Sequence, residues 1–366
     1  MQKVYLPSLS EKYFEGEATK NEWLVGYFIL RASGRKVTQK ELKQYQESLG
    51  KNSSILADRF RGCLLGLAIG DALGTTLEFR ERENNENHKD MIGGGVFNLK
   101  RGQWTDDTSM ALCLAYSLFD KKHFDPEDQM NLYLRWYREG LFSSNGRCFD
   151  IGNTTEAALL KFEKTQEPYS GSKDEHSAGN GSVMRLAPVV LFFLSRAQEA
   201  IANAGLSSKT THANIEAIDA CRYFAALLVG ALMGESKEKL LYGLYDPVGN
   251  YWEYFPLTKK IKALSNGEYI QKKRSEIRST GYVVDTLEAA LWSFYNSEDF
   301  ETGMIRAVNL GGDADTIGAV YGQIAGAYYG ETSIPYRWIK HLTTPHVFYY
   351  LADEFVSYYS GTPITE

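Results

Sequence analysis

Residues 311–330 read GGDADTIGAVYGQIAGAYYG, in which two glycines and an acidic cluster precede a helix rich in small residues. A second cluster, TDDT at residues 105–108, follows the loop sequence GQW and precedes the apolar run MALCLAYSLF. Either cluster alone is typical of a helix N-cap with an acidic first turn, which the helix dipole favours. Together they place hard oxygen ligands at two loop-to-helix junctions that are far apart in the sequence.

The two clusters contain four carboxylates, and their convergence would be costly unless a divalent cation offset the repulsion. Carboxylate and hydroxyl oxygens, without histidine or cysteine, indicate magnesium, manganese or calcium rather than zinc. Glu78, in GDALGTTLEF, lies beyond a glycine-punctuated helix and is a candidate third acid. Its spacing is equally typical of a solvated glutamate at a helix end.

The apolar spacing beyond residue 55 predicts an all-α fold. Val284, Leu287, Leu291 and Phe294 follow one another at steps of three or four residues. Residues 110–119 and 189–194 are apolar nearly all round, which indicates helices buried inside a large bundle. Polar, glycine-rich linkers at 80–105, 143–153 and 170–181 are longer than helix connections usually need, so we expect some of them to shape a site.

Composition excludes several classes of protein. The net charge is −6, which gives no evidence of a basic surface for nucleic acid. No stretch approaches the roughly 20 apolar residues of a membrane span, and the first residues lack the apolar middle of a secretion signal, so we expect a cytoplasmic protein with no membrane partner. The four cysteines contain no CxxC pair and predict neither a disulfide framework nor a zinc site.

A change in composition near residue 50 predicts a domain boundary. We assign residues 1–50 to an N-terminal extension, an arm plus short helices, and residues 51–366 to the main domain. Residues 1–20 form the arm, residues 23–30 are an apolar run, and a capping box at Thr38 predicts a helix through about Leu49. Residues 249–279 are polar and aromatic and give no clear assignment.

GNGSVMR at residues 179–185 is a glycine-containing turn that we expect to run directly into a helix. Backbone N–H groups at such a helix start suit phosphate oxygens, although an ordinary flexible turn has the same pattern. His212 precedes another predicted helix and either contacts a ligand or lies at the surface as a cap residue. No GxxxxGK[ST] motif, dinucleotide fingerprint or GxSxG elbow occurs, so nucleotide triphosphate hydrolysis and covalent serine catalysis are disfavoured.

Seven segments in order, namely GDALGTTLE, GQWTDDTSMAL, FDIGNTT, GNGSVMR, THANIEA, GYVVDTLEAALW and NLGGDADTIGAVYGQIAGAYYG, resemble the ADP-ribosylglycohydrolase family, which includes dinitrogenase-reductase-activating glycohydrolases. The resemblance covers about residues 55–345, and TDDT and GGDADTIGA are its most specific parts. It implies a compact, orthogonal all-α bundle with two magnesium ions in a cleft, where manganese can substitute.

The resemblance also implies roles for particular residues. Asp106 or Asp315 would act as the catalytic base. The metal ligands would be Glu78, Thr105, Asp106, Asp107, Asp313, Asp315 and Thr316. The substrate would be bound by Gly152, Asn180, Gly181, Ser182, Met184, His212 and Tyr282, with the GNGSVMR turn and His212 nearest its diphosphate or distal ribose.

The activity implied is magnesium-dependent removal of ADP-ribose from modified protein side chains, with the arginine linkage favoured. Hydrolysis of a serine linkage or of O-acetyl-ADP-ribose is the nearest enzymatic alternative. A non-catalytic inhibitor that binds an ADP-ribosyltransferase is the alternative from another class. Hydrolysis does not explain the extension at residues 1–50, and we expect it to bind and neutralise a cognate transferase toxin, as an immunity protein would. The alternative is that Trp23, Leu24, Phe28 and Leu30 pack onto the bundle as an extra helix.

Overall fold

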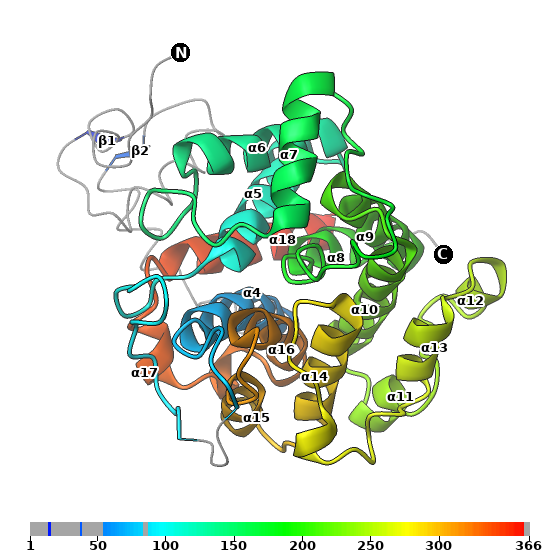
Figure 1. Cartoon of the computed structure of the whole chain (residues 1–366). Coiled ribbons are helices and arrows are strands. Elements are labelled where there is room, and N and C mark those ends of the chain that lie inside the picture. The colour runs from blue at the N-terminus through cyan, green and yellow to red at the C-terminus, as the bar shows by residue number, and fades with distance from the viewer. Residues whose placement is uncertain (1–13, 16–36, 39–53, 83–86, 362–366) are drawn as a thin grey trace.

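The computed structural model describes residues 14–15, 37–38, 54–82 and 87–361. Figure 1 shows an assembly of helices in which α4 and α16 lie side by side near the centre. The longer helices have these bounds: α4 Ile55–Gly74, α5 Asp106–Lys121, α6 Pro126–Glu139, α7 Asn153–Thr165, α9 Ala197–Thr211, α10 Ile215–Met233, α14 Val283–Tyr295, α15 Phe300–Val308, α16 Ala314–Tyr329 and α18 His346–Gly361.

Short elements join these helices. They are α8 Ala187–Phe193, α11 Lys237–Leu241, α12 Tyr251–Tyr254, α13 Lys259–Ser265, α17 Tyr336–Ile339 and the 3-10 turns η2 Arg274–Glu276 and η3 Glu331–Ser333. The stretch 249–279, unassigned from sequence, therefore contains α12, α13 and η2. No helix among the described residues is long and apolar enough to cross a membrane.

The predicted all-α fold is confirmed for the main domain. Residues 110–119 lie in α5, as their sequence predicts, and Pro188 lies in the first turn of α8. In the described part of the extension, β1 (Phe14–Glu15) pairs in parallel with β2 (Val37–Thr38). Thr38, the predicted first residue of a capping box, is the last residue of β2, and the helix predicted to follow it lies outside the described residues. The predicted arm, apolar run and helix otherwise lie outside the described residues.

Glycines bring the backbones of α4 and α16 into direct contact. They recur at every fourth position on both helices, at residues 62, 66, 70 and 74 and at residues 318, 322 and 326. A Cβ at Gly66 would lie 2.1 Å from the carbonyl oxygen of Gly322, and a Cβ at Gly322 would lie 1.9 Å from that of Gly66. No side chain fits between them, so only glycine allows this packing.

The same contact has an antiparallel register. Gly62 faces Gly326, Gly70 faces Gly318, and a Cβ at Gly74 would lie 2.5 Å from the Cα of Asp315. The C-terminal end of α4 therefore lies against the N-terminal end of α16. This places the acidic start of α16 beside the segment that leads to Glu78.

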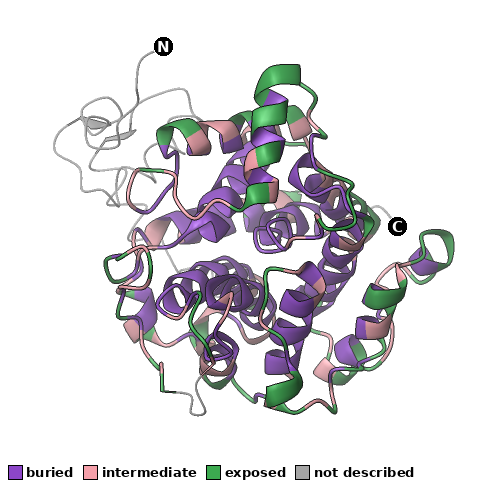
Figure 2. Ribbon diagram, in the orientation of Figure 1, coloured by how far each residue is buried: buried purple, intermediate pink, exposed green. Residues whose placement is uncertain are grey.

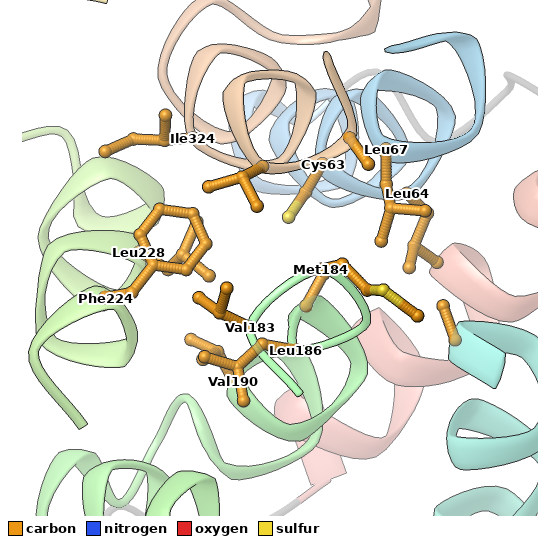
Figure 3. Packing of buried hydrophobic residues seen from close by; sticks show 14 of the residues in the cluster. Cys63, Leu64, Leu67, Val183, Met184, Leu186, Val190, Phe224, Leu228 and Ile324 are labelled. Carbon is orange, nitrogen blue, oxygen red and sulfur yellow. The ribbon is translucent and has the colours of Figure 1, made fainter. Parts of the chain in front are cut away.

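A continuous apolar core surrounds this pair. Figure 2 shows that the central helices are buried along most of their length. Figure 3 shows Val183 and Leu186, which follow the GNGS turn, near Phe224 and Leu228 of α10. The turn is thus anchored to the core on its C-terminal side, which fixes its position relative to α4 and α16.

We predict that Gly322→Ala lowers the free energy of unfolding by at least about 2 kcal/mol. Overpacking costs about 1–3 kcal/mol where neighbours can adjust, and here the neighbour is backbone; the helix preference of alanine restores only about 1 kcal/mol. Gly361→Ala is the control, because a Cβ there would meet no atom within 4 Å. Thermal unfolding followed by circular dichroism measures both, and equal melting temperatures for the two variants would contradict the close contact.

Candidate active site

The two acidic junctions meet at one cavity of about 480 Å³. It lies where the end of α4, the start of α5 and the start of α16 converge, and loops 143–153 and 170–181 help to line it, as their length suggested. The site residues predicted from sequence that line the cavity are Glu78, Asp106, Gly152, Asn180, Gly181, Met184, His212, Asp313, Asp315 and Thr316.

Asp71, which the sequence reasoning missed, holds the start of α5 in place. Its Oδ1 accepts hydrogen bonds from the backbone N–H of Thr105 at 2.8 Å and from its hydroxyl at 3.0 Å. Its Oδ2 accepts from the backbone N–H of Thr108 at 3.0 Å and from its hydroxyl at 2.6 Å. Asp71 thus caps α5 from another helix, a role that Thr105 does not fill with its own side chain.

The buried position of Asp71 affects its charge. Burial raises its pKa to about 6, although the four hydrogen bonds from Thr105 and Thr108 oppose the rise. A signal was available in the sequence, because an aspartate inside the apolar run LLGLAIGDALG has no reason to be there unless it bonds to another segment.

Thr105 joins the two acidic junctions. Besides its bond to Asp71, its hydroxyl lies 3.1 Å from Asp107 Oδ2 and 3.4 Å from Asp315 Oδ2. One hydroxyl donates a single hydrogen at a time, so it cannot satisfy all three carboxylates together. Thr105 and Asp107 are predicted metal ligands that do not line the cavity, but they lie directly behind its wall.

Glu78, Asp150 and Asp315 form the densest acidic group. One carboxylate oxygen from each lies within 4.8 Å of the others. Burial, followed by the charge of Asp313, raises the pKa of Glu78 to about 8, and burial, followed by the charge of Glu78, raises the pKa of Asp150 to about 10. Burial also raises the pKa values of Asp106, Asp107 and Asp315 well above their ordinary range.

Sequence reasoning selected Gly152 from FDIGNTT but missed Asp150 two residues earlier. Asp150 has a φ of 60°, a left-handed conformation that aspartate tolerates better than most residues. Nothing in the local sequence shows that this turn directs a carboxylate toward Glu78.

The acidic group has the properties of a divalent cation site. Two buried oxygens of the group, Glu78 Oε2 and Asp315 Oδ1, and Oδ1 of the neighbouring Asp107 have no hydrogen-bond partner among the described residues. Buried carboxylates without partners are costly, and a bound cation would satisfy them while lowering their raised pKa values. Oxygen-only donors suit magnesium, manganese or calcium, so these residues fit the cation that the sequence predicted.

Asp313 is held at the edge of the cavity by two neighbouring segments. Asn180 donates its side-chain amide to Asp313 Oδ2 at 2.7 Å and to the hydroxyl of Thr286 at 2.9 Å. The backbone N–H of Asp313 donates to the carbonyl of Ser279 at 3.1 Å. Gly312, with a φ of 63°, permits this approach, because a Cβ there would lie 2.0 Å from the same carbonyl oxygen.

The GNGSVMR segment differs from its prediction. Val183 and Met184 both donate their backbone N–H to the carbonyl of Asn180, which closes a turn, and α8 begins only at Ala187. The turn therefore does not run directly into a helix, and that expectation was wrong. The turn still lines the cavity through Gly179, Asn180 and Gly181.

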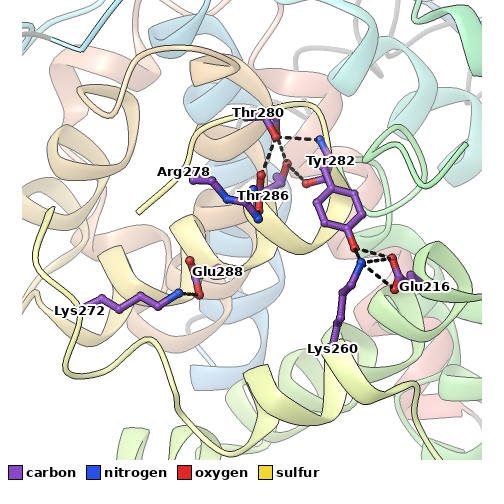
Figure 4. A network of polar contacts seen from close by, with 9 residues as sticks. Glu216, Lys260, Lys272, Arg278, Thr280, Tyr282, Thr286 and Glu288 are labelled. Atoms are coloured by element: carbon purple, nitrogen blue, oxygen red, sulfur yellow. Dashed lines mark hydrogen bonds and ion pairs between the residues drawn. The ribbon is translucent and has the colours of Figure 1, made fainter. Parts of the chain in front are cut away.

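Ser182 and Tyr282 do not line this cavity. Ser182 is buried, and its hydroxyl pairs with that of Ser208 at 2.9 Å. Figure 4 shows the hydroxyl of Tyr282 beside Glu216 and Lys260; the Lys260 Nζ donates to it at 2.7 Å, and the hydroxyl itself donates to Glu216. Tyr282 lines an adjoining cavity of about 460 Å³ that shares Thr154, Gly179 and Gly281 with the first.

His212 lines the cavity next to the turn at Gly179–Gly181. It is 2% exposed, and burial, followed by the charge of Arg185, lowers its pKa to about 3. The ring is therefore neutral in the physiological pH range. The other end of the same cavity is lined by carboxylates.

Comparison with known proteins identifies relatives of this chain. The sequence model of the ADP-ribosylglycohydrolase family matches residues 52–363. The chain is 43% identical to an ADP-ribosylarginine hydrolase Tri1 of Serratia proteamaculans, over 81% of this chain and 78% of the relative. It is 32% identical to an ADP-ribosyl-[dinitrogen reductase] glycohydrolase of Rhodospirillum rubrum, over 78% and 90%.

One solved structure is also similar. A chain from an ADP-ribosylglycohydrolase-related protein complex superposes with a TM-score of 0.72 and 43% sequence identity, covering 82% of this chain and 98% of that chain. Sequence and fold thus point to the same relatives.

We predict that, in chelator, Glu78→Gln gains stability over the wild type as the pH rises from about 5 to 8. The folded pKa of Glu78, about 8, lies above the unfolded value of about 4.3, so the folded state binds more protons in this range and stability falls as the pH rises. Glutamine does not titrate, so the variant does not lose this stability as the pH rises.

Thermal melting of both proteins across this pH range measures the effect, and saturating magnesium provides the control. Bound cation should abolish the advantage of Glu78→Gln or reverse it. A difference in melting temperature that does not change with pH in chelator would show that Glu78 is not held in a repulsive cluster.

Proposed function

The chain belongs to the ADP-ribosylglycohydrolase family, and we propose that it is a divalent-cation-dependent hydrolase that removes ADP-ribose from arginine side chains of modified proteins. The observation that carries the proposal is the convergence of five carboxylates on one cavity beside a glycine turn. They are Glu78, Asp106, Asp150, Asp313 and Asp315. The arginine linkage rests on the names of two relatives, ADP-ribosylarginine hydrolases that are 43% and 44% identical to this chain.

We assign the cation site to the residues around the unpartnered oxygens. Two magnesium ions, which manganese can replace, would be held by Glu78, Thr105, Asp106, Asp107, Asp313, Asp315 and Thr316, with Asp150 as a further carboxylate. When bound, the cations would orient the ribose hydroxyls and lower the pKa of a water molecule.

Asp106 and Asp315 are the candidates for the base. Both are buried carboxylates in the cavity wall, at the first turns of α5 and α16. As the bond from ribose C1″ to the side-chain nitrogen breaks through an oxocarbenium-like state, water adds to C1″, its proton passes to one of these carboxylates, and the guanidine leaves with the bonding electron pair and takes up a proton. The wall formed by the GNGS turn and His212 would hold the diphosphate, and this binding keeps C1″ within reach.

We predict that hydrolysis requires a divalent cation and favours the arginine linkage. ADP-ribosyl-arginine, ADP-ribosyl-serine and O-acetyl-ADP-ribose are each incubated with the protein in magnesium and in chelator, and released ADP-ribose, or for O-acetyl-ADP-ribose the loss of substrate, is measured. Asp106→Asn and Asp315→Asn should lower turnover by roughly 10²–10⁴-fold, the usual contribution of a positioned base. Without metal, both variants should melt at or above the wild-type temperature, because a like charge is removed.

Asp120→Asn, at the opposite end of α5, is the control and should retain full turnover. Equal hydrolysis in chelator would refute the cation-dependent mechanism. Preference for the serine or O-acetyl substrate would support the hydrolase activity but contradict the arginine linkage.

We also propose that residues 1–50 bind and neutralise a cognate ADP-ribosyltransferase. The family match begins at residue 52, so this segment lies outside the part of the chain that the family shares. An arm of about 20 residues can extend over about 60 Å, far enough to reach a neighbouring active site.

Deletion of residues 1–20 should leave hydrolysis and melting temperature unchanged and should abolish inhibition of an arginine-specific transferase encoded beside this chain. Full-length protein inactivated by chelator should still inhibit that transferase. If the truncated protein unfolds, or if intact protein does not bind the transferase, the segment is structural instead.

A further inference from the structure

Arg185 is a fully buried cation at the end of the GNGSVMR segment. Its side chain is 0% exposed, and no carboxylate forms a salt bridge with it within residues 54–82 and 87–361. It donates instead to the carbonyl of Gly181 at 2.8 Å, and its guanidinium lies 4.5 Å from the centre of the Tyr133 ring. A buried charge without a counter-charge is costly, and such charges are retained most often at functional sites.

The guanidinium also determines how Thr211 bonds. Arg185 Nη2 donates to the hydroxyl oxygen of Thr211 at 2.7 Å, and that oxygen lies 2.9 Å from Nδ1 of His212. An arginine can only donate, so the Thr211 oxygen accepts from it. Among the hydrogen bonds of the described residues, Nδ1 of His212 is the only acceptor for the hydrogen of the Thr211 hydroxyl, which is therefore directed to Nδ1. In a neutral imidazole, an Nδ1 that accepts leaves the proton on Nε2.

The Nε2 edge of His212 faces the turn in the cavity wall. A Cβ at Gly179 would lie 3.1 Å from Nε2, and a Cβ at Gly181 would lie 2.7 Å from the adjacent Cε1. Among the hydrogen bonds of the described residues, the ring of His212 makes only the one to Thr211 through Nδ1. The opposite nitrogen is therefore directed to the cavity that His212 lines.

The backbone of His212 is fixed by a second set of bonds. The hydroxyl of Ser208 donates to the carbonyl of His212 at 2.8 Å and pairs with Ser182, and the N–H of His212 donates to the carbonyl of Ser208 at 2.6 Å. Ser182, predicted from sequence to contact the substrate, therefore supports His212 instead. These bonds hold the backbone of His212 in place, and the bond to Thr211 orients its ring.

We infer that Arg185 is a positioning residue: through Thr211 it fixes His212 as the tautomer protonated at Nε2, which presents an N–H donor to a phosphate oxygen at Gly179–Gly181. The phosphate belongs to the diphosphate of ADP-ribose, and this part rests on the proposed function. The tautomer does not depend on any ligand. Burial lowers the pKa of His212 to about 3, so the ring is expected to stay a neutral donor between pH 5 and 8.

The decisive measurement is the tautomer of His212 in ligand-free, full-length protein. Nitrogen NMR of protein labelled in its histidine rings distinguishes the two tautomers, and His212→Asn assigns the resonance. We expect protonation at Nε2 without change between pH 5 and 8. A ring protonated at Nδ1, or a cationic ring, would overturn the inference.

Substitutions test the link to Arg185. Arg185→Met and Thr211→Val should both yield a mixture of tautomers and raise the Kd for ADP-ribose in magnesium by roughly tenfold or more, the usual effect of a lost hydrogen bond to a charged group. Thr211→Ser keeps the hydroxyl and should restore both values. If Arg185→Met fails to fold, the comparison of Thr211→Val with Thr211→Ser tests the inference by itself.

Thr210→Val is the matched control. The Thr210 hydroxyl also contacts Arg185, at 3.3 Å, but it donates to the carbonyl of Ser207 rather than to His212. This variant should keep the wild-type tautomer. If Thr211→Val changes neither the tautomer nor the Kd, Arg185 is only a structural residue. A different outcome is a wild type that has the expected tautomer but binds neither ADP-ribose nor pyrophosphate. That result would refute the proposed function and leave the link from Arg185 to His212 intact.

Discussion

The backbone contact between α4 and α16 is the constraint on which the site depends. Because glycines face each other at Gly66 and Gly322 and along the rest of the pair, the helices approach more closely than side chains would allow. Their antiparallel register brings the end of one helix to the start of the other. Asp315 then lies beside Gly74, and Glu78, in the segment that follows α4, lies close to Asp315. Acids far apart in sequence become neighbours because no side chain separates the helices.

Asp71 extends this constraint to a third helix. Its two oxygens accept four hydrogen bonds from Thr105 and Thr108, so the start of α5 is fixed to α4 rather than capped locally. The result is a rigid group of carboxylates, three with oxygens that no described residue satisfies. Such a cluster destabilises the metal-free fold, and burial, followed by the repulsion between the carboxylates, raises the pKa values of Glu78 and Asp150. The chain thus sacrifices stability at the place where a cation would bind.

The cavity has opposite electrostatic character at its two sides. Carboxylates occupy one side, whereas the other has the backbone of the GNGS turn, neutral His212 and the buried charge of Arg185 behind it. A substrate with a ribose to be held by cations and a diphosphate to be held by N–H donors matches this polarity. In the proposed function, binding of the diphosphate to the turn and His212 would position the glycosidic bond at the acidic side.

The sequence by itself determined the helical class, the locations of buried helices and the two acidic junctions, because helical periodicity and capping are local properties of the chain. It also located half of the residues that line the cavity, including Glu78, Asp313 and His212. Only the tertiary structure decided the direction of individual side chains. It added Asp71 and Asp150 to the site, placed Thr105 and Asp107 behind the wall, and directed Ser182 and Tyr282 elsewhere. These outcomes depend on which distant segment lies opposite each residue. That choice is made by the close contact of α4 with α16 and by the loops packed around it, and no local pattern encodes it.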